Sequence, residues 1–252
     1  MRIAVCVKQI PDPASPYELD PTTHFLQRPA EQVLDDTDRY GVEMGLQLAE
    51  QTEGTVTLVS MGPAGNLNGI RQALAMGAHK AVLIDDESLR GSDSLTTARV
   101  LAAAIEREGF DLVISGTEST DGYSGVVPQQ MAELLGVPAL TYAKSVSVEG
   151  STVKINRQTA SGYDSVEADT PVLVSVTAGV VEPRYPTFKG IMDAKKKTVD
   201  QFTAADLGVA PDSGQTIVSV RPAPERSSGE KVVDEGDAHL RIVTLLEQAK
   251  VI

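Results

Sequence analysis

The chain has 252 residues, 41% of them hydrophobic, which suits a soluble globular protein with one large core or two modest ones. Its 35 acidic residues outnumber 22 Lys and Arg, and the net charge of −13 argues against a general affinity for nucleic-acid phosphate. Cys6 is the single cysteine, so an intrachain disulfide is excluded and a reducing, intracellular setting is expected.

The N-terminal apolar run, Arg2 to Lys8, is too short for a signal peptide, and no run approaches the length that spans a bilayer. We therefore expect a cytoplasmic, bacterial-type chain with no targeting peptide and no membrane insertion. The three histidines are scattered and no Cys/His cluster occurs, so no metal site is expected.

Residues 1 to about 140 alternate short apolar runs with amphipathic stretches, which indicates a parallel sheet covered by helices. Continuous apolar runs predict strands buried on both faces at Ile3 to Val7, Thr55 to Ser60, Ala81 to Ile84 and Leu112 to Ser115. Helical spacing predicts helices at 35–51, around 67–76 with Gly77 at the end, at 93–108 and at 128–135. The expected fold is a doubly wound, mostly parallel α/β sheet.

Shorter runs follow, separated by turn residues such as Glu149-Gly150 and Ser161-Gly162. They predict a hairpin-rich extension of the sheet, with strands at Ser145 to Val148, Val153 to Asn156, Val166 to Ala168 and Val172 to Val176.

Residues 182–197 form a basic segment with large apolar side chains in an otherwise acidic chain. Pro183 and Pro186 disfavour a helix before Gly190 and favour projection from the scaffold. The segment predicts a surface offered to a partner, although Phe188, Ile191 and Met192 could also pack inward.

Residues 198–252 are read as an extended arm rather than a second domain, because 211–236 is rich in proline, glycine and charge. The arm ends in an amphipathic stretch, Ala238 to Lys250, which predicts a short helix that docks on this chain or another. The first domain is accordingly expected to cover residues 1–197.

A ligand is expected beyond the carboxyl ends of the strands, where the loop after Ser115 is the best candidate. Gly116, Gly122 and Gly125 permit close backbone approach, and hydroxyl groups precede a helix N-terminus that favours an anion such as phosphate. A simple turn remains an equal alternative. Neither a dinucleotide-binding nor a Walker motif occurs, and no catalytic constellation is present.

Several motifs together resemble the β subunits of electron transfer flavoproteins. They are Val5-Cys6-Val7-Lys8-Gln9, Ala73-Leu74-Ala75-Met76-Gly77-Ala78, Ser119-Thr120-Asp121-Gly122, and above all Glu182-Pro183-Arg184-Tyr185 with Gly190-Ile191-Met192-Asp193-Ala194-Lys195-Lys196-Lys197. The resemblance runs over the whole chain. It implies an adenine nucleotide-binding Rossmann-like fold and a heterodimer with an α subunit that holds most of the FAD. The short helix at the end of the arm is expected to pack on that partner subunit. The resemblance also implies electron transfer from acyl-CoA dehydrogenases of fatty acid β-oxidation to a quinone oxidoreductase, with no catalytic residues here.

The resemblance further implies a structural AMP in the crevice. The matching positions are Cys6, Asp35, Met61, Gly116, Asp121, Gly122, Tyr123, Ser124, Gly125, Val126 and Val127. The loop lacks the aspartate run and the Asn-Gln-Thr of some members, so backbone N–H groups would replace side-chain contacts to phosphate. Gln158 departs from a glutamate that positions the flavin domain in some members, and Tyr17 is the one aromatic residue expected near the flavin.

The basic segment matches the family's recognition loop for partner dehydrogenases, with Phe188 as its apolar anchor. The docking residues are Tyr185, Pro186, Thr187, Phe188, Lys189, Gly190, Ile191 and Met192. Three alternatives stay open: an electron-bifurcating relative with a second FAD in the crevice, a universal-stress-type AMP/ATP-binding module, and an ATP pyrophosphatase. The last is poorly matched by Ser115-Gly116-Thr117-Glu118-Ser119.

Overall fold

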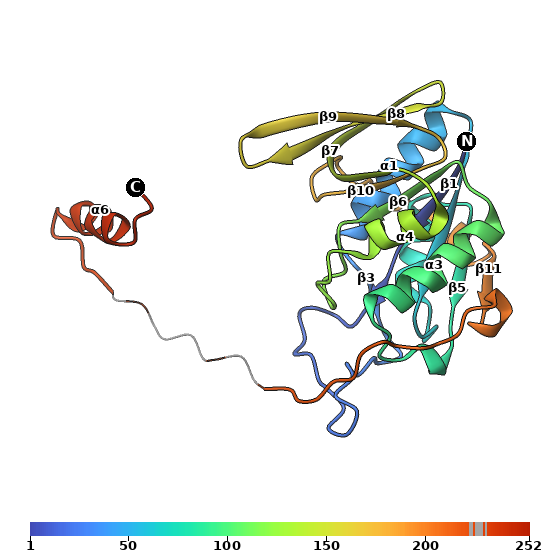
Figure 1. Ribbon diagram of the computed structural model, residues 1–252, viewed down its shortest axis with the longest axis horizontal. Coiled ribbons are helices and arrows are strands. Elements are labelled where there is room, and N and C mark those ends of the chain that lie inside the picture. The colour runs from blue at the N-terminus through green and yellow to red at the C-terminus, as the bar shows by residue number, and fades with distance from the viewer. Residues whose placement is uncertain (222–223, 225–228, 230) are drawn as a thin grey trace. The chain divides into compact units, whose positions relative to one another are not determined.

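The computed structural model describes residues 1–221, 224, 229 and 231–252, so part of the predicted arm lies outside the described residues. The chain divides into two compact units, Met1–Ile217 and Val218–Ile252. The first unit is built on one large sheet with helices on both faces (Figure 1). The expected α/β class is confirmed.

The main sheet has nine strands in the order β11-β5-β4-β1-β6-β10-β7-β8-β9. The parallel strands are β1 (Arg2–Cys6), β4 (Thr55–Met61), β5 (Lys80–Ile84), β6 (Leu112–Gly116), β7 (Ala139–Glu149), β10 (Val172–Val176) and β11 (Val199–Phe202). The antiparallel strands are β8 (Thr152–Thr159) and β9 (Gly162–Asp169). A separate pair joins β2 (Gln9–Ile10) to β3 (Val33–Leu34).

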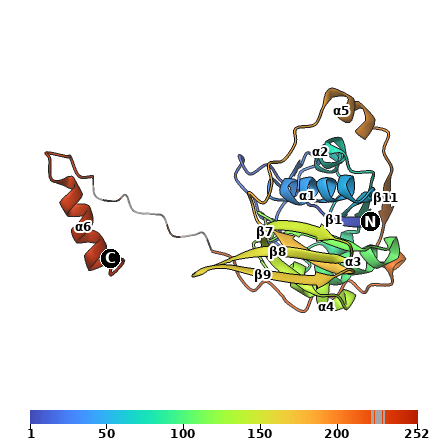
Figure 2. The ribbon, with the colours of Figure 1, turned by 90° about the horizontal axis from the view of Figure 1, so that it is seen from above.

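Helices cover the sheet on both faces, as Figure 2 shows from above. On one face lie α1 (Asp38–Gln51), α2 (Asn68–Met76) and α5 (Phe188–Ala194), and on the other lie α3 (Ser94–Glu108) and α4 (Val127–Leu135). Short 3-10 turns occur at η1 (Glu87–Leu89) and η2 (Ala205–Leu207). Asp93 caps α3 by accepting a hydrogen bond from the Thr96 N–H, which explains why that helix begins as predicted.

The alternation of side chains along β1 shows why its apolar run is continuous. Ile3 and Val5 belong to the core cluster that includes α1 and α2, whereas Ala4 and Cys6 belong to the cluster that includes α3 and α4. Successive side chains of a strand point to opposite faces, so a strand buried on both must be apolar throughout.

The hairpin extension is confirmed for β7, β8 and β9, which pair as an antiparallel meander. The inclusion of Val172–Val176 in that extension was wrong, because β10 pairs in parallel with both β6 and β7 inside the main sheet. All three strands are longer than the predicted runs, since backbone pairing continues past the apolar residues into polar ones. The sequence reading missed β11, which pairs in parallel with β5 although it contains few apolar residues. This pairing keeps residues 199–202 within the first compact unit, beyond the predicted end at Lys197.

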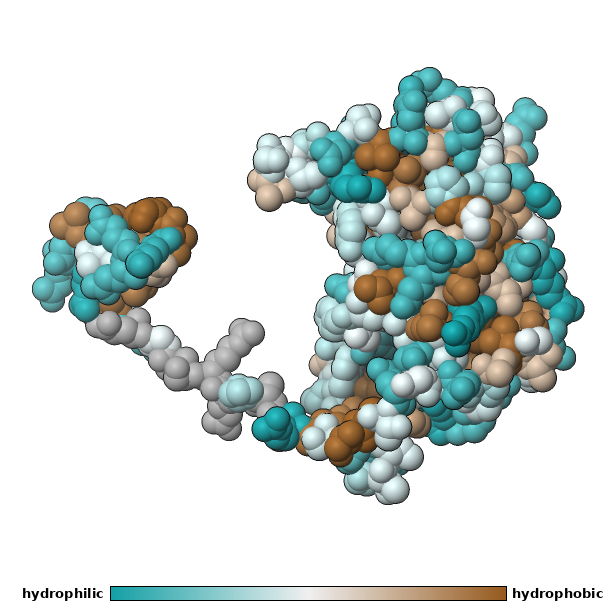
Figure 3. Space-filling model, in the orientation of Figure 1, coloured by the Kyte–Doolittle hydropathy of each residue, from teal (hydrophilic) through white to brown (hydrophobic). Residues whose placement is uncertain are grey.

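The second unit contains α6 (Ala238–Gln248), the helix expected at the end of the arm. Figure 3 shows hydrophobic side chains gathered on it, and Leu240, Ile242 and Leu245 are all exposed. Among the described residues, no helix combines the length and the apolar character that crossing a bilayer would need.

Candidate functional site

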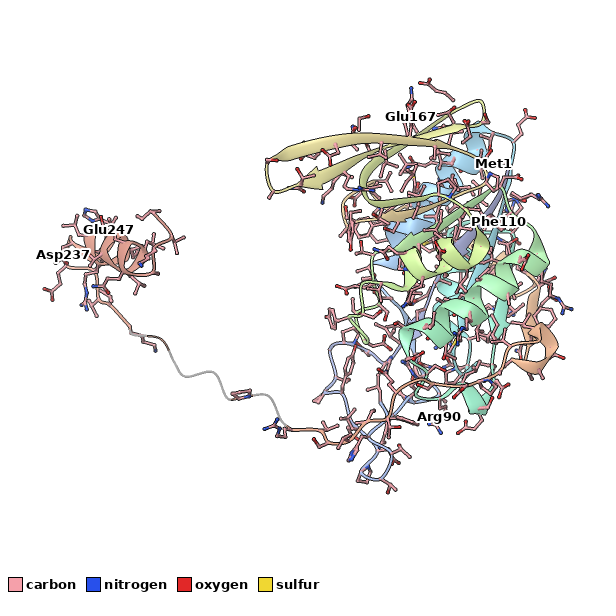
Figure 4. The ribbon with its side chains drawn as sticks, viewed as in Figure 1. Met1, Arg90, Phe110, Glu167, Asp237 and Glu247 are labelled. Carbon is pink, nitrogen blue, oxygen red and sulfur yellow. The ribbon has the colours of Figure 1, made fainter. Side chains whose placement is uncertain are left out.

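A crevice lies where the strand connections leave in opposite directions. After β1 the chain adds β4 and then β5 on one side of β1 within the sheet. It then returns to add β6 on the other side of β1. Two neighbouring cavities lie at the carboxyl ends of these strands: the Cys6 cavity, of about 110 Å³, and the Arg28 cavity, of about 340 Å³. Lys8, Met61 and Thr97 line both cavities, and Arg90, labelled in Figure 4, lines the second.

The loop between β6 and α4, residues 116–127, is called the glycine loop and is anchored by Asp35. The buried Asp35 carboxylate accepts hydrogen bonds from the Thr120 N–H at 2.7 Å and from the Thr120 hydroxyl at 3.0 Å. It also accepts from the N–H and hydroxyl of Thr37, just before α1. Asp35 therefore connects the start of α1 with the glycine loop.

Asp121 holds two cations at the boundary of the cavities. Its side chain is 0% exposed, its carboxylate lies 2.7 Å from Lys8 Nζ, and it is paired with the Arg28 guanidinium through its other oxygen. Burial acts to raise the Asp121 pKa, but the two cations outweigh it and hold that pKa below its usual range. The loop that carries Arg28 is thereby tied to the glycine loop.

Two ionisable groups in the Cys6 cavity are shifted toward their neutral forms. Burial, followed by the nearby Asp35 carboxylate, raises the pKa of Asp38 well above its usual range, although the Lys8 N–H donates to it at 2.7 Å. Burial and Asp38 raise the pKa of the Cys6 thiol to about 12. The thiol lies 3.9 Å from Met131 Sδ and stays protonated at neutral pH, so it packs as an apolar group rather than acting as a nucleophile.

We expect Asp38→Asn to increase the free energy of unfolding at pH 7. A carboxyl whose folded pKa is raised is most favourable below its unfolded value, and its contribution is lost as the pH rises toward the folded pKa. Asparagine stays neutral and can still accept from the Lys8 N–H. Denaturation of both proteins between pH 4 and pH 8 should show an advantage of the variant that grows with pH. The matched control is Asp36→Asn at an exposed carboxylate, and equal pH dependence for wild type and Asp38→Asn would contradict the assignment.

The Cys6 cavity has polar groups ready for a ligand. Ser115 Oγ is buried at the wall of the cavity and has no hydrogen-bond partner in the described part of the chain. Val126 is the N-cap of α4 and its side chain makes no capping hydrogen bond. The first backbone N–H groups of the helix therefore have no capping side chain to donate to. Gly125 adopts a φ of 65°, a left-handed conformation that favours glycine. These features fit an anion-bearing ligand with a hydrogen-bonding group.

The segment 182–197 presents large apolar side chains to solvent. Tyr185 and Phe188 are 83% and 82% exposed, and Ile191 and Met192 are partly exposed on α5. The expectation that the prolines disfavour a helix before Gly190 was wrong, since α5 begins at Phe188. The reason is the Thr187 side chain, which caps the helix by accepting from the Gly190 N–H at 3.0 Å.

Comparison with known proteins adds independent information. The model of the electron transfer flavoprotein domain matches residues 23–207. The electron transfer flavoprotein subunit beta of Mycobacterium tuberculosis (strain ATCC 25618 / H37Rv) is 42% identical, with 99% of each chain covered. The chain belongs to the family of electron transfer flavoprotein β subunits.

More distant relatives of this β-subunit family carry two kinds of name. The electron transfer flavoprotein subunit beta of Megasphaera elsdenii is 36% identical over 96% of this chain and 95% of its own. The caffeyl-CoA reductase-Etf complex subunit CarD of Acetobacterium woodii is 33% identical over 84% of this chain and 82% of its own.

The β-subunit fold brings together only part of the predicted crevice set. Cys6, Met61, Gly116, Ser124 and Val127 line the Cys6 cavity, and Met61, Asp121 and Gly122 line the Arg28 cavity. Four predicted residues line neither cavity: Asp35, Tyr123, Gly125 and Val126. Of these, Asp35 is hydrogen-bonded to Thr120 of the glycine loop, and the Tyr123 side chain is exposed to solvent.

Sequence reasoning missed several crevice residues of this β subunit. Lys8 carried a signal, because it lies two residues after the end of β1, but it was not chosen. Asp38 begins α1 and Ser115 is the last residue but one of β6, so both could have been found in the same way. Arg28 had no such signal, since it comes from a long loop whose course over the cavity depends on the ion pair with Asp121.

Proposed function

We propose that this chain is one half of a heterodimeric electron transfer flavoprotein that carries electrons from acyl-CoA and related dehydrogenases to a quinone oxidoreductase. The α subunit would hold most of the FAD, which when bound supplies the redox chemistry. This cytoplasmic chain would contribute the scaffold, a structural nucleotide and the docking segment, defined as residues 182–197. It would perform no bond-making step of its own.

The observation that carries the proposal is the exposure of Phe188 at the first residue of α5. Tyr185, Ile191 and Met192 are exposed within the same eight residues, and several large apolar side chains gathered on a surface are typical of a site that a partner covers. A bulky side chain that enters a desolvated pocket supplies much of the affinity of a small interface. A small interface also suits an electron carrier that must be released.

For the crevice we propose AMP. Ser115 Oγ and the N–H groups at the start of α4 would bind its polar groups, while Cys6, Met61 and Val127 would contact the apolar parts of the ligand. All the crevice residues predicted from the sequence stay part of this proposal. Asp35 would contribute indirectly, by holding the glycine loop in place. The second candidate for the crevice is a second FAD, as in the electron-bifurcating relatives; one similar protein is named as a subunit of a caffeyl-CoA reductase-Etf complex.

One experiment tests both parts. This chain is expressed with an α subunit, the complex is purified, and native mass, absorbance spectrum and extracted nucleotides are measured. We expect a heterodimer with one FAD and one AMP per complex. Two FAD and no AMP would replace our proposal by the bifurcating alternative. A colourless homodimer that binds ATP would overturn it in favour of a universal-stress-type module.

A further inference from the structure

The docking segment is tied to the scaffold at both ends, by contacts that the proposed docking role does not by itself require. The first tie joins Arg184 to α1. Its backbone N–H, Nε and Nη2 all donate to the Glu43 carboxylate, at 3.2, 2.7 and 3.0 Å. Its Nη1 donates to Glu50 at 2.6 Å. Arg184 thus uses most of its donors on two carboxylates of one helix.

Glu43 is unusual for a surface-helix glutamate because its side chain is only 3% exposed. Burial acts to raise its pKa, but hydrogen bonds from Arg184 and Gln47 outweigh burial and leave the pKa below its ordinary value. A buried carboxylate without a cation would be strongly unfavourable. The buried Glu43 carboxylate is therefore favourable only while the Arg184 guanidinium pairs with it, and the two-pronged hydrogen bonding fixes the position and orientation of that guanidinium.

The second tie joins the C-terminal end of the segment to α2. Lys197 Nζ donates to the carbonyl oxygens of Leu74 and Ala78, at 2.9 and 2.7 Å, near the end of that helix. Arg71, on α2, donates in the opposite sense to the carbonyl oxygens of Ala194 and Lys197, at 2.6 and 2.7 Å. The terminal carbonyls of a helix otherwise need water or a cap, so these bonds satisfy groups on both partners.

The middle of the segment is seated on the same helix. A Cβ at Gly190 would lie 2.5 Å from the Ala75 carbonyl oxygen, so glycine is needed for the close approach of α5 to α2. The contacts of the segment are thus made by its backbone, its glycine and its charged residues. Tyr185 and Phe188 are left free of them and exposed.

We propose that Arg184 is a positioning residue for docking, which through Glu43 fixes the root of the segment so that Tyr185 and Phe188 project in one prepared conformation. This inference rests on the proposed docking function. Ordering a segment before the partner arrives removes that entropic cost from binding. A guanidinium held by two carboxylates sets direction as well as distance, which an apolar contact in the same place would not do.

The test uses the heterodimer with Glu43 and Arg184 both replaced by methionine. Replacing both partners of a buried pair with apolar residues of similar size is close to neutral for stability, whereas removing one leaves a buried charge. We expect normal flavin content and an unchanged melting temperature. The KM for a reduced acyl-CoA dehydrogenase should rise about tenfold with kcat retained, the effect of ordering one or two side chains on binding. Amide hydrogen exchange in residues 182–197 should become faster.

Glu50→Gln is the matched control, because Glu50 is exposed and makes one bond to Arg184 while Glu43 keeps the rest. We expect its KM to stay within about twofold of wild type. An unchanged KM and unchanged exchange in the double variant would overturn the inference. Should the double variant not fold, Arg184→Lys decides: it keeps the charge but loses the fork geometry, and a wild-type KM would overturn the inference.

The variant Phe188→Ala distinguishes a failure of the positioning inference from a failure of the docking proposal. A raised KM for Phe188→Ala with a wild-type KM for the double variant would contradict positioning and leave docking intact. An unchanged KM for Phe188→Ala would contradict the docking proposal itself, and the positioning inference with it.

Discussion

Replacement of Asp121 with alanine should destabilise the protein by roughly 3 kcal/mol, the low end of the range for removing one partner of a buried ion pair. The low end applies because Lys8 and Arg28 keep 31% and 19% of their side chains exposed, so water can solvate them in part. Denaturant unfolding of the purified complex measures the loss.

The same variant should also lower the nucleotide content. Without Asp121 the cations repel each other and the loop that carries Arg28 separates from the glycine loop, so both cavities, which Lys8 and the glycine loop line, lose their shape. Nucleotide extracted per complex is the second measurement. Asp36→Ala is the control, since that carboxylate is exposed and makes a single long ion pair with Arg39. Equal losses for the two variants would show that Asp121 has no special role.

Acid should remove the Asp121 contribution in the wild type. The folded pKa of Asp121 lies below the unfolded value of about 3.8, so the stabilisation is complete above that value and is lost as the pH falls through the folded pKa. The stability difference between wild type and Asp121→Asn should therefore shrink between pH 5 and pH 2. A difference that grows on acidification would contradict this assignment.

Phe188→Ala should weaken docking without weakening the fold. The side chain is 82% exposed, so its removal deletes little packing within the described part of the chain. An apolar anchor contributes about 2 kcal/mol to an interface, which corresponds to a rise of roughly 30-fold in the KM for a reduced acyl-CoA dehydrogenase. Steady-state electron transfer over a range of dehydrogenase concentrations measures it.

Melting temperature and flavin content should not change in this variant. Tyr163→Ala is the matched control, because it truncates another exposed aromatic, on β9, away from the docking segment. Loss of flavin in Phe188→Ala would mean that the side chain packs against the α subunit instead of a dehydrogenase. A wild-type KM would contradict the docking proposal itself.

The parallel strands and their helices could be predicted from the sequence because burial on both faces leaves a local mark. The run from Ile3 to Cys6 is apolar without interruption, and Asp93 caps α3 at the residue where the amphipathic pattern begins. The exposure of Phe188 could also be inferred, once the family resemblance was added to the two prolines. In each case a few neighbouring residues carry the signal.

The ion pairs could not be predicted, because they join residues far apart in the chain. Asp121 meets Lys8 and Arg28, and Arg184 meets Glu43, only after the sheet has placed their loops and helices side by side. The sequence around a charged residue contains no pattern that identifies its ion-pair partner. The helix at Phe188 was missed for a related reason: Thr187 outweighed the prolines only through cap geometry.

The fold class, a crevice at the strand ends and the membership of the electron transfer flavoprotein family could therefore be inferred from the sequence alone. Hydrophobic periodicity, turn residues and motifs are local, and one chain displays them directly. The hydrogen bonds between Asp35 and the glycine loop, the link that Asp121 makes between two loops and the tie from Arg184 to α1 became visible only in the folded protein. Those contacts depend on distances between elements, which packing sets and no stretch of sequence contains.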